Sequence, residues 1–398
     1  MSGAVVSLRN PAVVALGGGH GLSASLSALR LMSDRLTAVV TVADDGGSSG
    51  RLREELGVLP PGDLRMALAA LCDDSEWGRT WSALLQHRFT SEGDLDNHAV
   101  GNLLIVALWE LLDDPVAGLD WVGKLLGARG RVLPMAAVPL RIEADVWTQG
   151  RLETVVGQSR VAVTHDRIEQ LRLVPADPPA CPEAVRAVEE ADWVVLGPGS
   201  WFSSVMPHLL VPELARALHE TSARRCVTLN LSSETGETFG LTATEHLEVL
   251  HKHAPELRID AVVADPAAGA GAEPLAAAAA GHPATAHREE PHKHAPEQRR
   301  DAVVADPAAV EDTEQLAEAA ARMGARLLLR QVRRGDGTPR HAALRLAAAY
   351  RDVFDDVLGD VGSPARWALA ASGARRGQAR EGPGPRVRAG LGGGPPRG

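Results

Sequence analysis

The sequence predicts an α/β fold with a mostly parallel sheet between two layers of helices and with a small β-rich insertion. Short apolar runs have the length and continuous hydrophobicity of strands covered on both faces, at 12–17, 36–43, 192–197, 225–231, 258–265 and 325–332. Segments with apolar residues at helical spacing alternate with them, at 22–32, 60–73, 98–112, 211–220, 242–253 and 311–324. Such alternation is typical of a parallel sheet with helices on both faces.

The boundaries of the fold follow from the places where this alternation begins, changes and stops. We expect one α/β domain over 10–355, in which strand-like pieces and turn signals at 131–175 form the β-rich insertion. The run at 60–73 predicts a turn and then a helix with Asp63 near its N-cap. The long apolar run at 98–112 predicts a central helix.

Two segments depart from the alternating pattern. HKHAPELRIDAVVADPAA at 251–268 recurs almost unchanged at 292–309, so 266–309 looks like a duplicated, low-complexity insert. We expect the first copy to supply the strand, because Leu257 and Ile259 can pack where Gln298 and Arg300 cannot. The Gly/Pro/Arg-rich end at 366–398 has no periodicity, which predicts a disordered tail.

Composition excludes several classes of protein. The formal net charge of −10 and an aromatic content of 3% argue against a nucleic-acid partner. We find no signal peptide and no apolar run long enough to cross a membrane, so we expect a cytoplasmic protein without membrane insertion. The three cysteines, Cys72, Cys181 and Cys226, are scattered, which fits buried side chains in a reducing compartment and predicts no metal site.

A glycine run follows the first predicted strand and precedes a helix. In VVALGGGHGLS the residues Gly17, Gly18, Gly19, His20 and Gly21 leave backbone N–H groups free to face a ligand. The helix N-terminus adds partial positive charge, and together these features suit a phosphate or diphosphate. The spacing fits neither a dinucleotide fingerprint, since Leu22 replaces its last glycine, nor a P-loop.

Two adjacent acids end the next predicted strand, in TVADDGGSSGRLR. Asp44 and Asp45 are followed by Gly46, Ser48, Ser49 and Arg51. Three interpretations compete: a metal and phosphate site, carboxylates that accept hydrogen bonds from ribose hydroxyls, and a solvated turn. The pair of acids at the ligand edge of a parallel sheet favours a binding site.

A second glycine-containing loop follows a predicted strand later in the chain. DWVVLGPGSWFSS places Gly197, Pro198, Gly199 and Ser200 after a strand, which predicts a second anion-binding loop. Asn230 ends the strand after that, and Asn102 lies near the start of the apolar helix at 98–112. We therefore expect the site to combine residues from all these strand and helix ends.

These motifs, taken together and in this order, resemble one family. GGGHG, VTVADDGGSSGRLR, PPGDLR, HAVGNLL, GPGSWFSSV and NLSSETGET look like those of the YvcK-type gluconeogenesis factors, most closely the actinobacterial ones, over about residues 10–355. That family is related to 2-phospho-L-lactate transferase, and the resemblance implies a Rossmann-like three-layer α/β/α fold. It also implies a cytoplasmic regulatory protein that binds UDP-N-acetylglucosamine, with a part in carbon allocation and cell-wall or cell-shape control.

The resemblance also implies roles for particular residues. Gly17–Gly21 and Gly197–Ser200 would meet the diphosphate, and Asp44, Asp45, Ser48 and Asn230 would line the nucleotide or sugar pocket. No cofactor is required for binding. The alternative function is a transferase that moves a phosphate-linked group from a nucleotide donor, with Mg²⁺ on Asp44 or Asp45 and help from Asp63. An NAD-dependent oxidoreductase is a third class. The sequence leaves open homo-oligomerisation and a protein partner.

Overall fold

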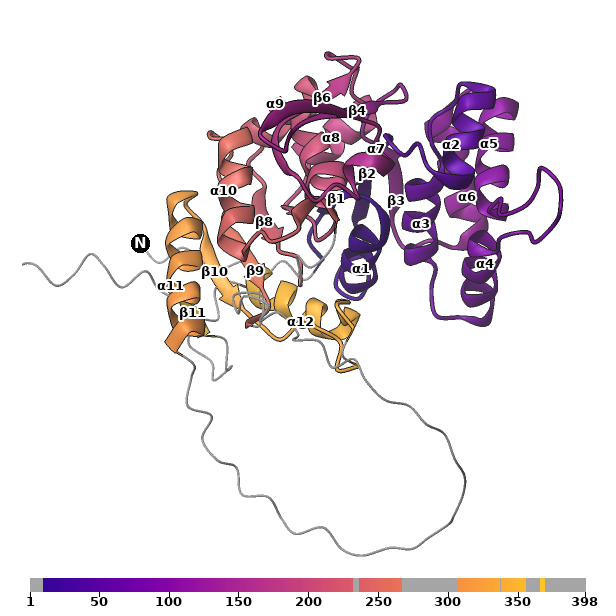
Figure 1. Ribbon diagram of the computed structural model, residues 1–398. Coiled ribbons are helices and arrows are strands. Elements are labelled where there is room, and N and C mark those ends of the chain that lie inside the picture. The colour runs from indigo at the N-terminus through magenta and orange to yellow at the C-terminus, as the bar shows by residue number, and fades with distance from the viewer. Residues whose placement is uncertain (1–9, 232–235, 267–306, 337, 356–365, 369–398) are drawn as a thin grey trace, which may run out of the picture.

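The computed structural model describes residues 10–231, 236–266, 307–336, 338–355 and 366–368. Its main sheet has the strand order β11-β10-β9-β8-β7-β1-β2-β3. All neighbours in it are parallel except β10 and β11, which pair antiparallel at one edge. Helices lie on both sides of this sheet (Figure 1). The expected three-layer α/β/α fold is therefore confirmed.

The elements follow the predicted alternation except between β2 and β3, where the helices α2 to α6 succeed one another. The strands of the main sheet are β1 Val13–Gly17, β2 Leu36–Val40, β3 Arg131–Pro134, β7 Trp193–Leu196, β8 Arg224–Thr228, β9 Ala261–Ala264, β10 Arg326–Leu329 and β11 Arg366–Ala368. The α-helices are α1 Gly19–Leu29, α2 Gly47–Leu56, α3 Gly62–Leu71, α4 Glu76–Gln86, α5 Val100–Leu112, α6 Pro115–Leu126, α7 Gln158–Val161, α8 Pro182–Glu189, α9 Pro212–Glu220, α10 Ala243–His253, α11 Pro307–Arg322 and α12 Ala343–Phe354. Three short non-α helices are η1 Trp201–Val205, η2 Met206–Leu210 and η3 Gly236–Thr238.

The strand order places a switch point beside β1. From β1 the chain adds β2 and β3 on one side, and then returns to add β7, β8, β9 and β10 on the other side. All residues of β1 and β7 are buried, which fits strands covered by helices on both faces. Loops that leave the carboxyl ends of two such strands diverge to opposite faces, and ligands of open α/β sheets bind in the crevice between them.

A second sheet covers part of the carboxyl edge of the main sheet. It consists of β4 Arg141–Thr148, β5 Arg151–Val156 and β6 Arg167–Val174, all antiparallel, in the order β5-β4-β6. The structure differs from the expected insertion at its start. The first strand of 131–175, β3, pairs in parallel with β2 and belongs to the main sheet.

Helices α2 to α6 form a lobe between β2 and β3 (Figure 1). The expectation that 98–112 is a central helix is wrong. Helix α5 buries one side, including Ile105 and Trp109, while Leu111 on the other side is 77% exposed. A run of apolar residues indicates burial but does not show which layer provides it.

The first copy of the duplicated segment supplies a core strand, as its side chains predict. Leu257 and Ile259 are buried, and Ala261–Ala264 forms β9 between β8 and β10. The second copy lies outside the described residues up to 306, and its end, 307–309, opens α11. The expected disordered tail needs a correction at its start, because Arg366–Ala368 pairs with β10; 369–398 lie outside the described residues.

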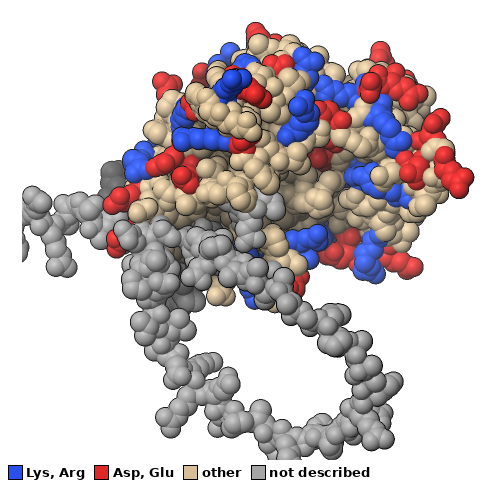
Figure 2. All heavy atoms as spheres, in the orientation of Figure 1, with Lys and Arg blue, Asp and Glu red and all other residues tan. Residues whose placement is uncertain are grey.

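Two further features of the structure are the polarity of its helices and the distribution of charge on its surface. Within the described ranges, each helix is too short or too polar to cross a membrane. Figure 2 shows basic and acidic side chains interspersed over the visible face, so the net charge does not come from one uniform patch there.

We predict that the duplication can be removed without loss of stability. Deleting residues 269–309 joins Ala268 to Val310 and keeps Pro-Ala-Ala-Val at the start of α11, since 266–268 repeat 307–309. The shorter connection between β9 and α11 costs less entropy to close. We expect an equal or higher melting temperature by circular dichroism. A large drop would show that the second copy contributes to the core.

Candidate functional site

The two glycine loops meet at the switch point. Gly18, in extended conformation, is the N-cap of α1 and offers that helix no side-chain cap. A Cβ on Gly21 would lie 2.2 Å from the carbonyl oxygen of Pro198 and 2.4 Å from the Cα of Gly199. The backbones of the two loops are thus in direct contact, and only glycine fits at position 21. The N-terminus of α1, which has no cap from Gly18 and bonds Asp63 through the backbone of Gly19, lies beside the second loop.

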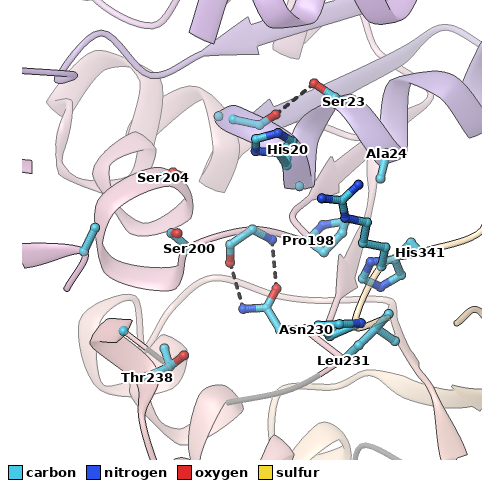
Figure 3. Close-up of a pocket in the computed structure, with 18 of the residues that line it drawn as sticks. His20, Ser23, Ala24, Pro198, Ser200, Ser204, Asn230, Leu231, Thr238 and His341 are labelled. Atoms are coloured by element: carbon cyan, nitrogen blue, oxygen red, sulfur yellow. Dashed lines mark hydrogen bonds between the residues drawn. The ribbon is translucent and has the colours of Figure 1, made fainter. Parts of the chain in front are cut away.

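A side chain that follows β8 fixes the second loop. The amide of Asn230 accepts a hydrogen bond from Gly199 N and donates one to Gly199 O, both at 2.9 Å. Figure 3 shows this pair of bonds on the cavity wall between Leu231 and Ser200, opposite His20 and Ser23 of α1. Asn230 therefore positions the loop as well as lining the cavity.

A cavity of about 710 Å³, here called the main cavity, opens between these loops. Nine predicted site residues line it: Gly18, Gly19, His20, Gly21, Asp63, Pro198, Gly199, Ser200 and Asn230. Its other walls come from the continuation of α1, from α7, from Gly236–Thr238 and from the segment between β10 and α12. Sequence reasoning missed the residues on these walls: Ser23, Ala24, Ser27, Gln158, Ala162, Ser204, Leu231, Gly236, Glu237, Thr238, Arg334, Pro339, Arg340, His341 and Ala343.

Part of this missed set could have been found. Ser23 and Ser27 follow Gly19 at intervals of four on α1, which places them on one face of the helix. Arg334 follows β10 at the same carboxyl edge as the predicted residues. No comparable signal marks Gln158 or Ala162, because the small sheet reaches the cavity only through tertiary packing.

A smaller cavity of about 250 Å³, here called the second cavity, adjoins the first. Five predicted residues line it besides Asp63, namely Asp44, Gly46, Ser48, Ser49 and Asn102, and Asp63 is common to both cavities. The structure therefore divides the predicted site into two compartments. Four predicted residues, Gly17, Asp45, Arg51 and Gly197, line neither.

The side chains of Asp45 and Arg51 bind backbone groups elsewhere. The carboxylate of Asp45 accepts a hydrogen bond from Ser159 N at 2.9 Å, which connects α7 to the segment between β2 and α2. Arg51 donates to the backbone oxygens of Asp94 and Asp96, at 3.2 and 2.6 Å. The sequence indicated residue types suited to a site but not the direction of these side chains.

Buried polar groups organise the second cavity. Arg65 Nε donates to Asn102 Oδ1 at 2.9 Å, and Asn102 Nδ2 donates to Ser48 Oγ at 3.0 Å. Ser48 Oγ also accepts from Ala99 N at 3.3 Å and lies 3.0 Å from His98 Nδ1. The hydroxyl of Ser48 therefore donates to His98, whose pKa is lowered by burial and then by Arg51. Ser48 and Asn102 thus hold the cavity wall together.

Asp63 has a strongly perturbed carboxyl group. Burial, and next the neighbouring charge of Asp44, raise the pKa of Asp63 to about 7, against hydrogen bonding from the backbone of Gly19. Burial also raises the pKa of Asp44, although Gly46 N donates to its Oδ1 at 3.0 Å. Cβ atoms on Gly18 or Gly62 would lie 2.4 and 2.8 Å from these carboxylates, so the glycines admit them.

The acids offer a minimal set of ligands for a cation. Among the described residues, no group of three or more His, Cys, Asp or Glu side chains could hold a metal ion. Mg²⁺ often binds through one or two carboxylates and completes its shell with water and phosphate oxygens. Asp44 and Asp63 fit that requirement.

The comparisons with known proteins define the class. Residues 13–310 match the family described as 2-phospho-L-lactate transferase CofD, and the chain belongs to this family. A solved structure of a Bacillus halodurans protein, described as a member of the UPF0052 family, has a TM-score of 0.60 and 36% identity, covering 67% of this chain and 82% of that one.

Within that family, the chain is similar to gluconeogenesis factors. It is 56% identical to the "Putative gluconeogenesis factor" of Mycobacterium tuberculosis H37Rv over 257 residues, which cover 64% of this chain and 75% of the relative. It is 39% identical to the "Gluconeogenesis factor" of Halalkalibacterium halodurans over 246 residues, covering 62% and 74%. The resemblance found from the motifs is confirmed, including its actinobacterial character.

We predict that Asp63 destabilises the folded protein at high pH. Its native pKa of about 7 exceeds the ordinary value of 3.8, so ionisation costs more in the folded than in the unfolded state. That cost is full above pH 7 and disappears as pH falls toward 4. Asp63→Asn should therefore raise the melting temperature more at about pH 8 than at about pH 5.

Thermal unfolding at both pH values measures this difference, with the exposed Asp94→Asn as the control for removal of one negative charge. A stability gain from Asp63→Asn that is equal at the two pH values contradicts the buried ionisation.

Proposed function

We propose that the main cavity binds a nucleotide sugar, UDP-N-acetylglucosamine, and that the protein is a cytoplasmic regulator of carbon allocation and cell-wall or cell-shape control. The observation that carries the proposal is the direct contact between the two glycine loops at the switch point, which places the first turn of α1, without a cap from Gly18, on the cavity wall. Free N–H groups and the helix dipole favour a diphosphate there. The names of the gluconeogenesis-factor relatives support the regulatory role.

Size and charge agree with such a ligand. Pockets for small molecules and cofactors measure about 300–1,000 Å³, and the main cavity has about 710 Å³. Arg334 and Arg340 on its wall supply cations that suit phosphate oxygens, with their backbones joined by a 2.8 Å hydrogen bond. Hydroxyl, amide and carboxyl groups around the second cavity suit the hydroxyl groups of a sugar.

Calorimetric titration with UDP-N-acetylglucosamine tests the proposal. We expect saturable binding to the wild-type protein and its loss in Gly21→Ala, because the added Cβ would collide with the second loop. The matched control is Gly123→Ala in α6, where the nearest heavy atom is 3.9 Å away. This control should bind normally and gain about 0.5–1 kcal/mol of stability. No heat of binding at millimolar ligand would refute the proposal.

A second candidate, a group transferase, is favoured by Asp63. A carboxyl group with a pKa of about 7 stands where the two cavities meet, and a group with such a pKa can accept a proton at neutral pH. A nucleotide donor in the main cavity and a hydroxyl acceptor in the second cavity would place Asp63 between them. Asp44 would hold Mg²⁺, which would neutralise phosphate charge, and Asp63 would remain the proton acceptor.

Release of the nucleotide in the presence of Mg²⁺ and small hydroxyl acceptors tests this candidate. Turnover should be abolished in Asp63→Asn and retained in Asp45→Asn, because Asp45 lines neither cavity and binds the backbone of Ser159 instead. Binding of the nucleotide sugar without release for any acceptor would leave the regulatory function alone.

A further inference from the structure

A chain of buried hydroxyl groups lies directly beneath the second glycine loop. Ser25 of α1 donates to the carbonyl oxygen of Gly197 at 2.8 Å. The hydroxyl of Tyr350 of α12 lies 2.7 Å from Ser25 Oγ and 3.0 Å from Thr228 Oγ1, at the end of β8. All three hydroxyl-bearing side chains are fully buried.

The direction of every bond in this chain follows from counting protons. The Gly197 carbonyl can only accept, so Ser25 uses its single proton there. Ser25 Oγ must then accept from Tyr350, which in turn accepts from Thr228. Burial raises the pKa of Tyr350, so its proton stays in place. The resulting order is Thr228 to Tyr350 to Ser25 to Gly197, and aligned hydroxyls in a buried chain strengthen one another.

The Tyr350 hydroxyl joins the elements that carry the site. Ser25 belongs to the helix that begins in the first glycine loop, and Gly197 opens the second loop. Thr228 stands two residues before Asn230, which binds Gly199 in that same loop through both of its amide atoms. Helix α12 packs against α1, and its first residue, Ala343, lines the main cavity. Helix α12 also follows the end of the family match at residue 310.

We propose that Tyr350 is a positioning residue for ligand binding: its hydroxyl fixes the second glycine loop against α1 through Ser25, and so sets the geometry of the anion cradle. Helix α12, which lies after the matched residues 13–310, thereby supports the second glycine loop from the protein interior. Two measurements test this role: the affinity for the ligand, which rests on the proposed function, and amide hydrogen exchange in the second loop, which needs no ligand.

The test compares Tyr350→Phe with a matched loss of a buried hydroxyl elsewhere. Ser33→Ala removes a hydroxyl that is 3% exposed and that bonds the carbonyl of Pro11, near the amino end of β1. Amide hydrogen exchange of peptides covering 197–200 should be faster in Tyr350→Phe and unchanged in Ser33→Ala. The dissociation constant for UDP-N-acetylglucosamine should rise about tenfold in Tyr350→Phe alone, the size expected for loss of a buried hydrogen bond.

A second pair of variants guards against a misfolded Tyr350→Phe protein. Thr228→Val keeps the shape of the side chain but removes the first donor of the chain, whereas Thr228→Ser keeps the donor. Exchange at 197–200 should quicken in the first and not in the second. Equal exchange in Tyr350→Phe and wild type, or equal effects of Tyr350→Phe and Ser33→Ala, overturns the proposal. If the wild-type protein binds no ligand, the proposed function fails while the exchange result still decides the role of Tyr350.

Discussion

The arrangement of the site depends on one steric constraint, the contact between two backbones at Gly21. A Cβ there would lie 2.2 Å from the Pro198 carbonyl oxygen, so any other residue would separate the loops. The contact is available only because β1 and β7 are neighbours in the sheet although far apart in the chain. The N-cap of α1 is Gly18, where a Cβ would lie 2.4 Å from Asp63 Oδ2, so the helix has no cap from its own N-cap residue and its first N–H group bonds Asp63 instead.

The second loop, like the first, leads into a helix whose first N–H groups meet a buried carboxyl group from another part of the chain. Glu237 Oε1 accepts hydrogen bonds from Phe202 N and Ser203 N, at 2.7 and 3.1 Å, and so satisfies the start of η1 from within the protein. The second loop acts as a rigid wall, which Asn230 and the hydroxyl chain hold in place.

The fold was predictable in large part because its signals are local, and the site was predictable where glycine and acid motifs end strands. Gly18–Gly21 and Pro198–Ser200 line the main cavity because parallel strands place their carboxyl ends at one edge of the sheet. Asp45 and Arg51 show the limit, since their bonds to Ser159 and to the 94–96 backbone depend on tertiary packing. The wall at 334–343 has no motif, and only the return of the chain from β10 to α12 brings it to the cavity.

Asp63 connects the two candidate functions through one electrostatic conflict. Its carboxyl group binds the backbone of Gly19 at the helix N-terminus where a diphosphate would lie, so an ionised Asp63 and the ligand repel each other. A pKa of about 7 lets a proton relieve this repulsion near neutral pH, and a cation on Asp44 and Asp63 would relieve it differently. A regulator needs only to bind its ligand, and Asp63 can take up a proton when the ligand binds. A transferase needs Asp63 ionised beside the acceptor, so that the carboxylate can accept the acceptor's proton. The protonation state of Asp63 in the complex therefore separates recognition from turnover.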